Sequence, residues 1–546
     1  MKRIIVCCDG TWNDSISTDS PLTNVARISR CIPGISASGI VQIVSYYCGI
    51  GSGTSKPGNF VDGLTGRGVS ANIREAYTFI CHNYESDGDD IDEIVLIGFS
   101  RGAFTARAIA SLIADVGLLK KGGLGYMIKL YKLWANQLFK GREEDPMFPE
   151  MPQSTPRDRM RELCQRLTDL DLLRTDIKIK VCAVWETVGS LGFPVPGPFP
   201  QWASKKLAFV NSALDQKIEV AIQALALNER RKHFQPTVWQ SNGTTKLKQC
   251  WFLGAHSDVG GGNEDTGLAN LALVWILAQL DEYVFFDRDA LLHLASDKIL
   301  GSDEAIKTNV VEFAIEVIPF PFIGETSFKW SVSDVIPASL KKTSGKIKNS
   351  MQGPFVLAGA KSRKPGQYLM NTSGLHKNPK SNPARTDETI HWTVRVLLGQ
   401  GLRKCPALKK YATSIDNNMK LTWNLYSKKG APTAIQLDEA EFSDLERDLL
   451  SSWMEAEINA QDGASGPSRQ ANFSYKIANK QFDRLLSSSP IEMRSLSNIL
   501  NPLLDEARRP TILYHSTTNR AGEAATRVVQ ENMGNRQDQV ADDVPA

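Results

Sequence analysis

Short apolar runs alternate with longer segments of helical periodicity along the first half of the chain, and this alternation constrains the fold more than any other feature. The runs are rich in β-branched and aromatic residues, as buried parallel strands are. They lie at 3–8, 41–48, 93–99, 177–185 and 250–255. Helical spacing falls between them, at 69–84, 103–119 and 212–227. The pattern predicts an α/β fold: a mostly parallel sheet with helices on both faces, and ligands beyond the carboxyl ends of the strands.

Three stretches depart from this alternation and indicate the domain organisation. We expect a core at 1–300 that carries a charged helical insertion at 120–176, and a return of the core at 386–455. Between the two parts of the core, residues 301–385 form a lid or cationic insertion. From 456 to 546 the chain is rich in Ser, Asn, Gln, Asp and Gly, which predicts a polar, partly disordered C-terminal extension.

Charge and composition restrict the function and the compartment. The formal net charge of +3 gives no general attraction for nucleic acid. Nine cysteines without a C-x-x-C pair indicate reduced thiols. The apolar start is too short for a secretory signal, and the apolar stretch at 268–280 is shorter than the ~20 residues of a membrane span. We therefore expect a cytoplasmic protein with a buried helix at 268–280.

The pentapeptide GFSRG at residues 98–102 fits the G-x-S-x-G pattern at the point where a strand pattern changes to a helix pattern. In a turn of this kind a serine is held above the sheet edge, beside a helix N-terminus that favours negative charge. Glycines on either side let the two arms of the turn pass closely. Ser100 is therefore a candidate nucleophile. The alternative is a tight turn in which the glycines and the serine have no catalytic role.

A serine nucleophile needs a base and an acid that orients the base, and two of the seven histidines follow patterns that fit. The order nucleophile, acid, histidine is typical of α/β-hydrolase sheets. It favours Ser100, Asp258 and His391, because Asp258 follows an apolar run in a glycine-rich turn. The alternative set is Ser100, Glu186 and His256, since Glu186 ends another apolar run. Both sets stay open at the level of the sequence.

Acyl transfer also needs donors for the oxyanion that forms on the substrate. The backbone N–H of Arg101 is one candidate, because it follows the nucleophile. The amides of Gly10 and Thr11 are the other, since they follow the first strand and Gly10 permits a close approach. An Asp-Gly turn that only closes this strand is the alternative.

Two further functions fit the same residues. Asp9, His256 and Asp258 supply oxygen and nitrogen ligands on neighbouring loops, from which a metal-dependent phosphoesterase could be built. The second further function is that of a catalytically silent binding protein, which keeps the hydrolase fold without the reaction. The serine hydrolase is the preferred interpretation, and it requires neither a metal nor a cofactor.

Six motifs together resemble one known family. They are CCDGTWND at 7–14, YYCGIGSG at 46–53, GFSRGAFTAR at 98–107, VWETVGSLG at 184–192, ALALNERRKHFQPTVW at 224–239 and WFLGAHSDVGGG at 251–262. The family that they resemble is the α/β-hydrolase domain family known as DUF2235. It includes the catalytic domain of Tle1-type phospholipase effectors of type VI secretion, and many fungal proteins.

The resemblance implies a Ser-Asp-His ester hydrolase, carried onto Ser100, Asp258 and His391. Relatives often have Asp where this chain has Glu186, which keeps a carboxylate and moves it by one methylene, so the alternative triad stays open. The implied substrate is a small-molecule or lipid ester, and only some members of the family are phospholipases. Neither the substrate nor the oligomeric state follows from the sequence.

The segment from Lys341 to Arg385 contains ten Lys and Arg residues and no Asp or Glu. It lies between Asp258 and His391 in the chain, so in this fold we expect it at the mouth of the site. There it would attract an anionic ester, or an anionic membrane surface to which the protein binds peripherally. A solvated loop without such a role is the alternative.

If this segment attracts anionic substrates, raising the salt concentration increases KM for an anionic ester, because salt screens exposed charges. KM for a neutral ester with the same acyl chain should stay unchanged. Steady-state kinetics on the matched pair of esters measures both values. Equal insensitivity of the two KM values to salt would rule the attraction out.

Overall fold

The structure is a computed structural model, and all the residues that it describes lie in the compact unit Met1–Ala464. It describes residues 1–10, 21–49, 67–86, 91–140, 144–188, 210, 214–287, 290, 347–352, 356, 359–368, 385–399, 405–415, 421–427, 429–440, 443 and 446. Thr11, most of the insertion at 301–385 and the extension at 456–546 lie outside the described residues.

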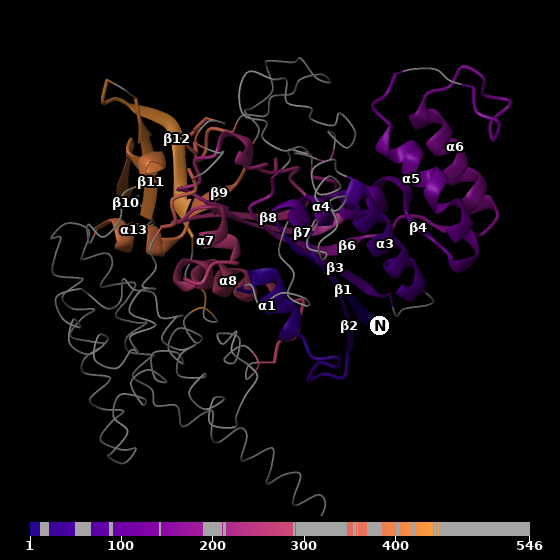
Figure 1. Cartoon of the computed structure of the whole chain (residues 1–546), viewed down its shortest axis with the longest axis horizontal. Helices are drawn as coiled ribbons and strands as arrows, with labels where there is room; N and C mark the ends of the chain where they lie inside the picture. The colour runs from indigo at the N-terminus through magenta and orange to yellow at the C-terminus, as the bar shows by residue number, and fades with distance from the viewer. Residues whose placement is uncertain are drawn as a thin grey trace, which may run out of the picture. The chain divides into compact units, whose positions relative to one another are not determined.

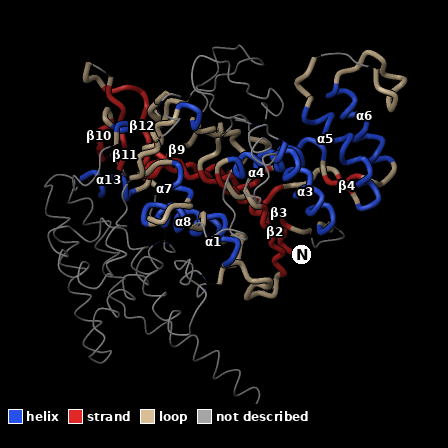
Figure 2. Tube along the Cα trace, in the orientation of Figure 1, coloured by secondary structure: helices blue, strands red, loops and turns tan. Residues whose placement is uncertain are grey.

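Ten strands in the described ranges form one sheet, and Figure 2 shows it as a band with helices on either side. Across the sheet the order is β2 (Val41–Tyr47), β1 (Lys2–Cys8), β3 (Glu93–Phe99), β6 (Ile179–Trp185), β7 (Ile218–Ala226), β8 (Lys246–Phe252), β9 (Glu388–Ile390), β12 (Pro432–Glu439), β11 (Leu421–Tyr426) and β10 (Tyr411–Ile415). Neighbours from β2 to β12 are parallel, and β11 and β10 add antiparallel pairs at one edge. The carboxyl ends of the parallel strands therefore share one edge of the sheet.

Helices cover both faces of the sheet and bury its strands (Figure 1). The helices that pack on the central strands are α1 (Asn24–Arg30), α3 (Arg67–Asn83), α4 (Arg101–Val116) and α8 (Gly267–Leu280). Within β1, Ile5 and Cys7 pack on the face of α1 and α8, whereas Ile4 and Val6 pack on the face of α3 and α4. Because both faces of the sheet are covered by apolar side chains, the sequence of β1 is an uninterrupted hydrophobic run and does not alternate with polar residues.

The segment 120–176, expected to be a helical insertion, overlaps a group of elements that lies outside the large sheet (Figure 1). The elements of this group are β4 (Leu118–Leu119), the 3-10 helix η1 (Lys121–Tyr126), α5 (Met127–Ala135), α6 (Pro156–Asp169) and β5 (Leu173–Arg174). β4 and β5 pair antiparallel and close the insertion at its base. The short elements elsewhere are η3 (Lys232–Phe234), α7 (His256–Gly260), α13 (Trp392–Gly399) and η5 (Pro406–Leu408). In the described ranges, no helix has the length and apolar character that crossing a membrane requires.

The α/β fold predicted from the alternation is confirmed, but one element was assigned wrongly. The segment 212–227, expected to be a helix, contains strand β7 instead. β7 lies between β6 and β8 with nearly all of its residues buried, so its apolar residues do not alternate with polar ones. Its β-branched residues, Ile218, Val220 and Ile222, are the signal that favours a strand. The run expected at 250–255 begins earlier, as β8, and ends at Phe252.

The first turn of α4 lies against the end of β1 at a point where only glycine fits. A Cβ on Gly102 would lie 2.1 Å from the carbonyl oxygen of Cys8 and 2.4 Å from that of Asp9. Both contacts are with backbone, which cannot rotate away as a side chain can. Gly102 therefore sets how closely the helix approaches the strand.

Replacing Gly102 by alanine should lower the free energy of unfolding by about 2 kcal/mol or more, since the helix must move away from β1. Urea unfolding of the purified variant measures this change. Gly34→Ala is the matched control, because nothing lies within 4 Å of a Cβ at Gly34. The control should change stability by less than about 0.5 kcal/mol. Equal stability of the two variants would contradict the packing constraint.

Candidate active site

Ser100 occupies the turn between β3 and α4 in a backbone conformation that is rare outside glycine. Its φ is 58° and its ψ is −119°. A Cβ on Gly98 would lie 2.6 Å from the carbonyl oxygen of Gly102, so small residues are needed where the two arms pass. The N–H of Ser100 donates to the carbonyl of Trp185, at the end of β6, over 3.1 Å. This strained turn holds the serine at the carboxyl edge of the sheet.

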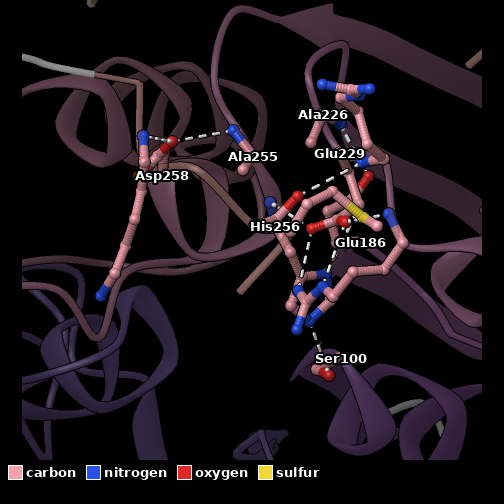
Figure 3. A network of polar contacts seen from close by, with 12 residues as sticks. Ser100, Glu186, Ala226, Glu229, Ala255, His256 and Asp258 are labelled. Atoms are coloured by element: carbon pink, nitrogen blue, oxygen red, sulfur yellow. Dashed lines mark hydrogen bonds and ion pairs between the residues drawn. The ribbon is translucent and has the colours of Figure 1, made fainter. Parts of the chain in front are cut away.

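The hydroxyl of Ser100 meets the imidazole of His256 (Figure 3). His256 begins α7 just beyond β8, and its Nε2 lies 2.8 Å from Ser100 Oγ. Its Nδ1 lies 3.1 Å from Oε2 of Glu186, the residue that follows β6. A proton on Nδ1 that is donated to the carboxylate leaves Nε2 as the acceptor for the serine hydroxyl. The three side chains thus have the contacts of a nucleophile, a base and an orienting acid.

Glu186 is completely buried and accepts hydrogen bonds at both of its oxygens. Oε1 accepts from the N–H of Ala226 at the end of β7, over 2.7 Å. Oε2 accepts from Nη2 of Arg363, also over 2.7 Å. The φ of Glu186 is 46°, which places it, like Ser100, in the left-handed region. Sequence reasoning missed Arg363, because nothing in the sequence separates it from the other nine cations of its segment.

Aromatic rings enclose the imidazole of His256. Its centroid lies 4.8 Å from that of Phe99 and 5.0 Å from that of Phe234, which approaches edge-on. Burial lowers the pKa of His256, and its hydrogen bond to Glu186 opposes this shift. The imidazole therefore stays neutral to lower pH than an exposed histidine does, and a neutral imidazole can accept a proton.

A second buried carboxylate, that of Glu229, supports the backbone of the histidine. Its Oε2 accepts from the N–H of His256 over 3.3 Å, and the guanidinium of Arg231 binds both carboxylate oxygens. Burial acts to raise the pKa of Glu229, but the hydrogen bonds and charge of Arg231 outweigh it and bring the pKa to about 2. Both residues belong to the motif at 224–239, to which the sequence analysis assigned no role.

Asp258, expected to be the acid, lies away from Ser100 (Figure 3). Its Oδ2 accepts from the backbone N–H groups of Ala255 and Lys348, over 2.8 and 2.9 Å. Its Oδ1 accepts from the side-chain amide of Asn263 over 2.9 Å. Burial raises the pKa of Asp258. The geometry contradicts the predicted acid: this carboxylate closes the first turn of α7 and anchors residue 348.

His391, expected to be the base, lies just beyond β9 with both ring nitrogens bonded elsewhere. Nδ1 lies 2.8 Å from the hydroxyl of Thr393, and Nε2 lies 3.1 Å from Oε1 of Glu446. The ring is buried and packs against Phe252, with 4.5 Å between centroids. The predicted triad of Ser100, Asp258 and His391 is therefore not assembled, and the imidazole at Ser100 is that of the alternative set.

The predicted oxyanion donors differ in whether their backbone N–H already has a hydrogen-bond acceptor in its own turn. Arg101 opens α4, and the amides of a first helical turn have no acceptor within the helix. The N–H of Gly10 donates to Oδ1 of Asp9 over 2.6 Å, so the turn itself uses this donor. Thr11 lies outside the described residues.

The ligands of the alternative metal site serve separate hydrogen-bond networks. Asp9 accepts from the hydroxyl of Thr23, over 2.8 and 2.7 Å, and from that of Tyr46 over 2.5 Å. His256 and Asp258 have the partners given above. In the part of the chain that the structure describes, no three His, Cys, Asp or Glu side chains are arranged to hold a metal ion.

The mostly parallel sheet and the turn at Ser100 define an α/β-hydrolase-like protein. Residues 2–279 match the family described as "T6SS, Phospholipase effector Tle1-like, catalytic domain". The chain belongs to this family. The resemblance to Tle1-type catalytic domains that the motifs indicated is thereby confirmed.

Known relatives match only part of the chain. An uncharacterized protein of Saccharomyces cerevisiae is 28% identical over 247 residues, which are 43% of this chain and 32% of the yeast protein. A crystal structure of an uncharacterized protein from Pseudomonas aeruginosa has 16% identity and a TM-score of 0.28, with 62% of this chain and 57% of that chain covered. The structure of the Tle1 effector bound to the VgrG spike has 19% identity and a TM-score of 0.25, with 49% and 52% covered. The chain thus spans a third of the yeast protein and little more than half of each solved chain.

The low pKa of Glu229 predicts a specific acid sensitivity. A depressed pKa in the folded state stabilises the protein above the ordinary value of 4.5, and this stability is lost as the pH falls toward about 2. Glu229→Gln should therefore flatten the decline in the free energy of unfolding over this window, measured by urea unfolding at a series of pH values. Glu150→Gln, which removes a half-exposed partner of Arg166, should keep the wild-type decline. Parallel declines in the two variants would show that Glu229 is not responsible.

Proposed function

We propose that the protein is a serine hydrolase that cleaves acyl esters of lipids, phospholipids included, with Ser100, His256 and Glu186 as its triad. One observation carries the proposal: Ser100 Oγ lies 2.8 Å from His256 Nε2, while His256 Nδ1 lies 3.1 Å from Glu186 Oε2. A turn with only a structural role does not require a strained serine in contact with a buried histidine that a carboxylate orients.

The reaction proceeds in two halves. Ser100 Oγ attacks the acyl carbon while His256 Nε2 takes the hydroxyl proton, which gives a tetrahedral oxyanion. The imidazolium then protonates the leaving alcohol oxygen as the ester bond breaks, and the acyl group stays on Ser100. In the second half, water gives a proton to the same nitrogen and attacks the acyl carbon. Collapse of this second intermediate releases the fatty acid and returns the proton to Ser100, and Glu186 stabilises each imidazolium.

The oxyanion accepts a hydrogen bond from the backbone N–H of Arg101. This N–H follows the nucleophile and belongs to the N-terminus of α4, whose dipole favours negative charge. Burial lowers the pKa of the Arg101 guanidinium to about 10, so the side chain stays cationic at neutral pH. The positive end of the α4 dipole lies beside the nucleophile when the oxyanion forms.

Family membership and local charge support lipid esters as the substrate class. The family description names phospholipase effectors. Arg101 is the residue next to the nucleophile, and its guanidinium stays cationic at neutral pH. A cation near the site attracts an anionic headgroup. The cationic segment from Lys341 to Arg385 extends this attraction, and an anionic membrane surface is the partner that we propose for it.

Ser100→Ala and His256→Ala should each lower kcat by a factor of about 10³ or more, because each removes a group that the acylation step needs. Asp258→Asn and His391→Gln are the matched controls and should retain kcat in the fraction that folds. Hydrolysis of a short-chain ester and release of fatty acid from phospholipid vesicles measure these rates. Circular dichroism checks the fold of each variant.

A fluorophosphonate probe provides a second readout of the same triad. It should label Ser100 in the wild-type protein, as located by peptide mapping, and fail to label the His256→Ala variant. An active Ser100→Ala variant would contradict the assignment. So would a large loss of kcat in folded His391→Gln with His256→Ala unaffected.

A further inference from the structure

We propose that Arg363 is a positioning residue for this reaction: its guanidinium pairs with the carboxylate of Glu186 and fixes it in the orientation that His256 needs. The inference rests on the proposed triad and adds a fourth side chain to it. Arg363 touches neither Ser100 nor His256 through any hydrogen bond that the described residues make. It acts through the carboxylate.

The contact between the two residues is short and excludes water. Nη2 of Arg363 lies 2.7 Å from Oε2 of Glu186, and both side chains are completely buried. Oε2 is also the oxygen that faces His256 Nδ1, at 3.1 Å. Oε1 is held from the other side by the N–H of Ala226. Three donors therefore fix the plane and the rotation of the carboxylate, and the donor with a permanent charge is Arg363.

Charge explains why this donor matters to the reaction. An ionised carboxylate in a buried site needs a compensating charge, or it takes up a proton instead. The base at rest is a neutral imidazole, so it does not supply that charge. Among the described residues, Arg363 is the one cation that forms an ion pair with Glu186 at rest. A protonated Glu186 would no longer stabilise the imidazolium that forms when Ser100 attacks.

The backbone on both sides of Arg363 fixes the guanidinium in place. On one side, the N–H of Lys361 donates to the carbonyl of Arg230 over 2.8 Å. On the other, the N–H of Gly366 donates to Oε2 of Glu388 over 2.8 Å. The segment 359–368 is thus bound to the chain beyond β7 and to β9, and Arg363 extends from a fixed point. One of the ten cations of the segment is therefore assigned to the triad rather than to solvent.

Other ionisable groups also face this network and would remain in a variant of Arg363. They are His256 on α7, Glu229 and Arg231 beyond β7, and Tyr368, which interacts electrostatically with both Arg363 and Glu186. Because these groups are unchanged, a shift of the pH profile in an Arg363 variant reports the loss of the guanidinium. Loss of the cation favours a proton on Glu186 and on His256 alike, so both effects move the profile in the same direction.

The test is the pH dependence of kcat/KM for a short-chain ester, measured between about pH 5 and about pH 9. In Arg363→Met, the acidic limb should move to higher pH by about one unit or more, since the buried carboxylate has lost its countercharge. Arg363→Lys keeps a cation and should return the limb most of the way to the wild-type position. If the acidic limb of folded Arg363→Met stays at the wild-type pH, the proposal is wrong. A purely structural role predicts lower stability without a shift of the pH profile.

A matched control and a second variant complete the experiment. Arg385→Met removes a cation from the same segment, but Arg385 is 86% exposed and pairs with Asp387, so the profile should not move. If Arg363→Met does not fold, Arg363→Gln keeps an N–H donor on a shorter side chain without the charge, and the same two outcomes apply. Ser100→Ala distinguishes failure of the proposed triad from failure of the positioning role of Arg363. If it is inactive while the Arg363 profiles match the wild type, only the positioning role fails, whereas an active Ser100→Ala variant removes the triad itself.

Discussion

The imidazole of His256 joins the carboxyl ends of three strands, and the rest of the site depends on this junction. It reaches β3 through Ser100 and β6 through Glu186, and it extends from the turn that follows β8. β7 separates β6 from β8 in the sheet, yet it takes part as well, because Ala226 at its end donates to Glu186. The contacts therefore require four neighbouring strands in register. The parallel ladders between these strands set that register.

Buried charge around this junction is arranged in two compensated pairs. Arg363 pairs with Glu186 at the side chain of the histidine, and Arg231 pairs with Glu229 at its backbone. Each carboxylate near His256 thus has its own guanidinium, and the network is close to electrically neutral at rest. When the imidazole gains a proton, the new charge forms within reach of two carboxylates that are already paired and oriented. Little reorganisation is then required during the reaction.

The sequence predicted the fold and the candidate nucleophile because both depend on local patterns. Ser100 follows a strand in a turn whose glycines are dictated by close backbone contacts. The partners of Ser100 were harder to choose, since both candidate triads follow the order nucleophile, acid, histidine. What decides between them is the course of the turn after β8, which directs His256 toward Ser100 and Glu186 and directs Asp258 toward the backbone of Ala255 and Lys348. No local pattern in the sequence reports that direction. The role of Arg363 could not be predicted from the sequence for another reason. It lies 177 positions from Glu186 in the chain, and no local pattern indicates such a contact.

Ser100 and Glu186 share a further property: at both positions the backbone adopts angles that suit glycine better than a residue with a side chain. At Ser100, glycine would relieve this strain but remove the nucleophile. At Glu186, glycine would relieve the strain but leave the guanidinium of Arg363 buried without its partner. Durability and chemistry are thus opposed just beyond β3, while just beyond β6 a buried ion pair makes the strained residue necessary to both.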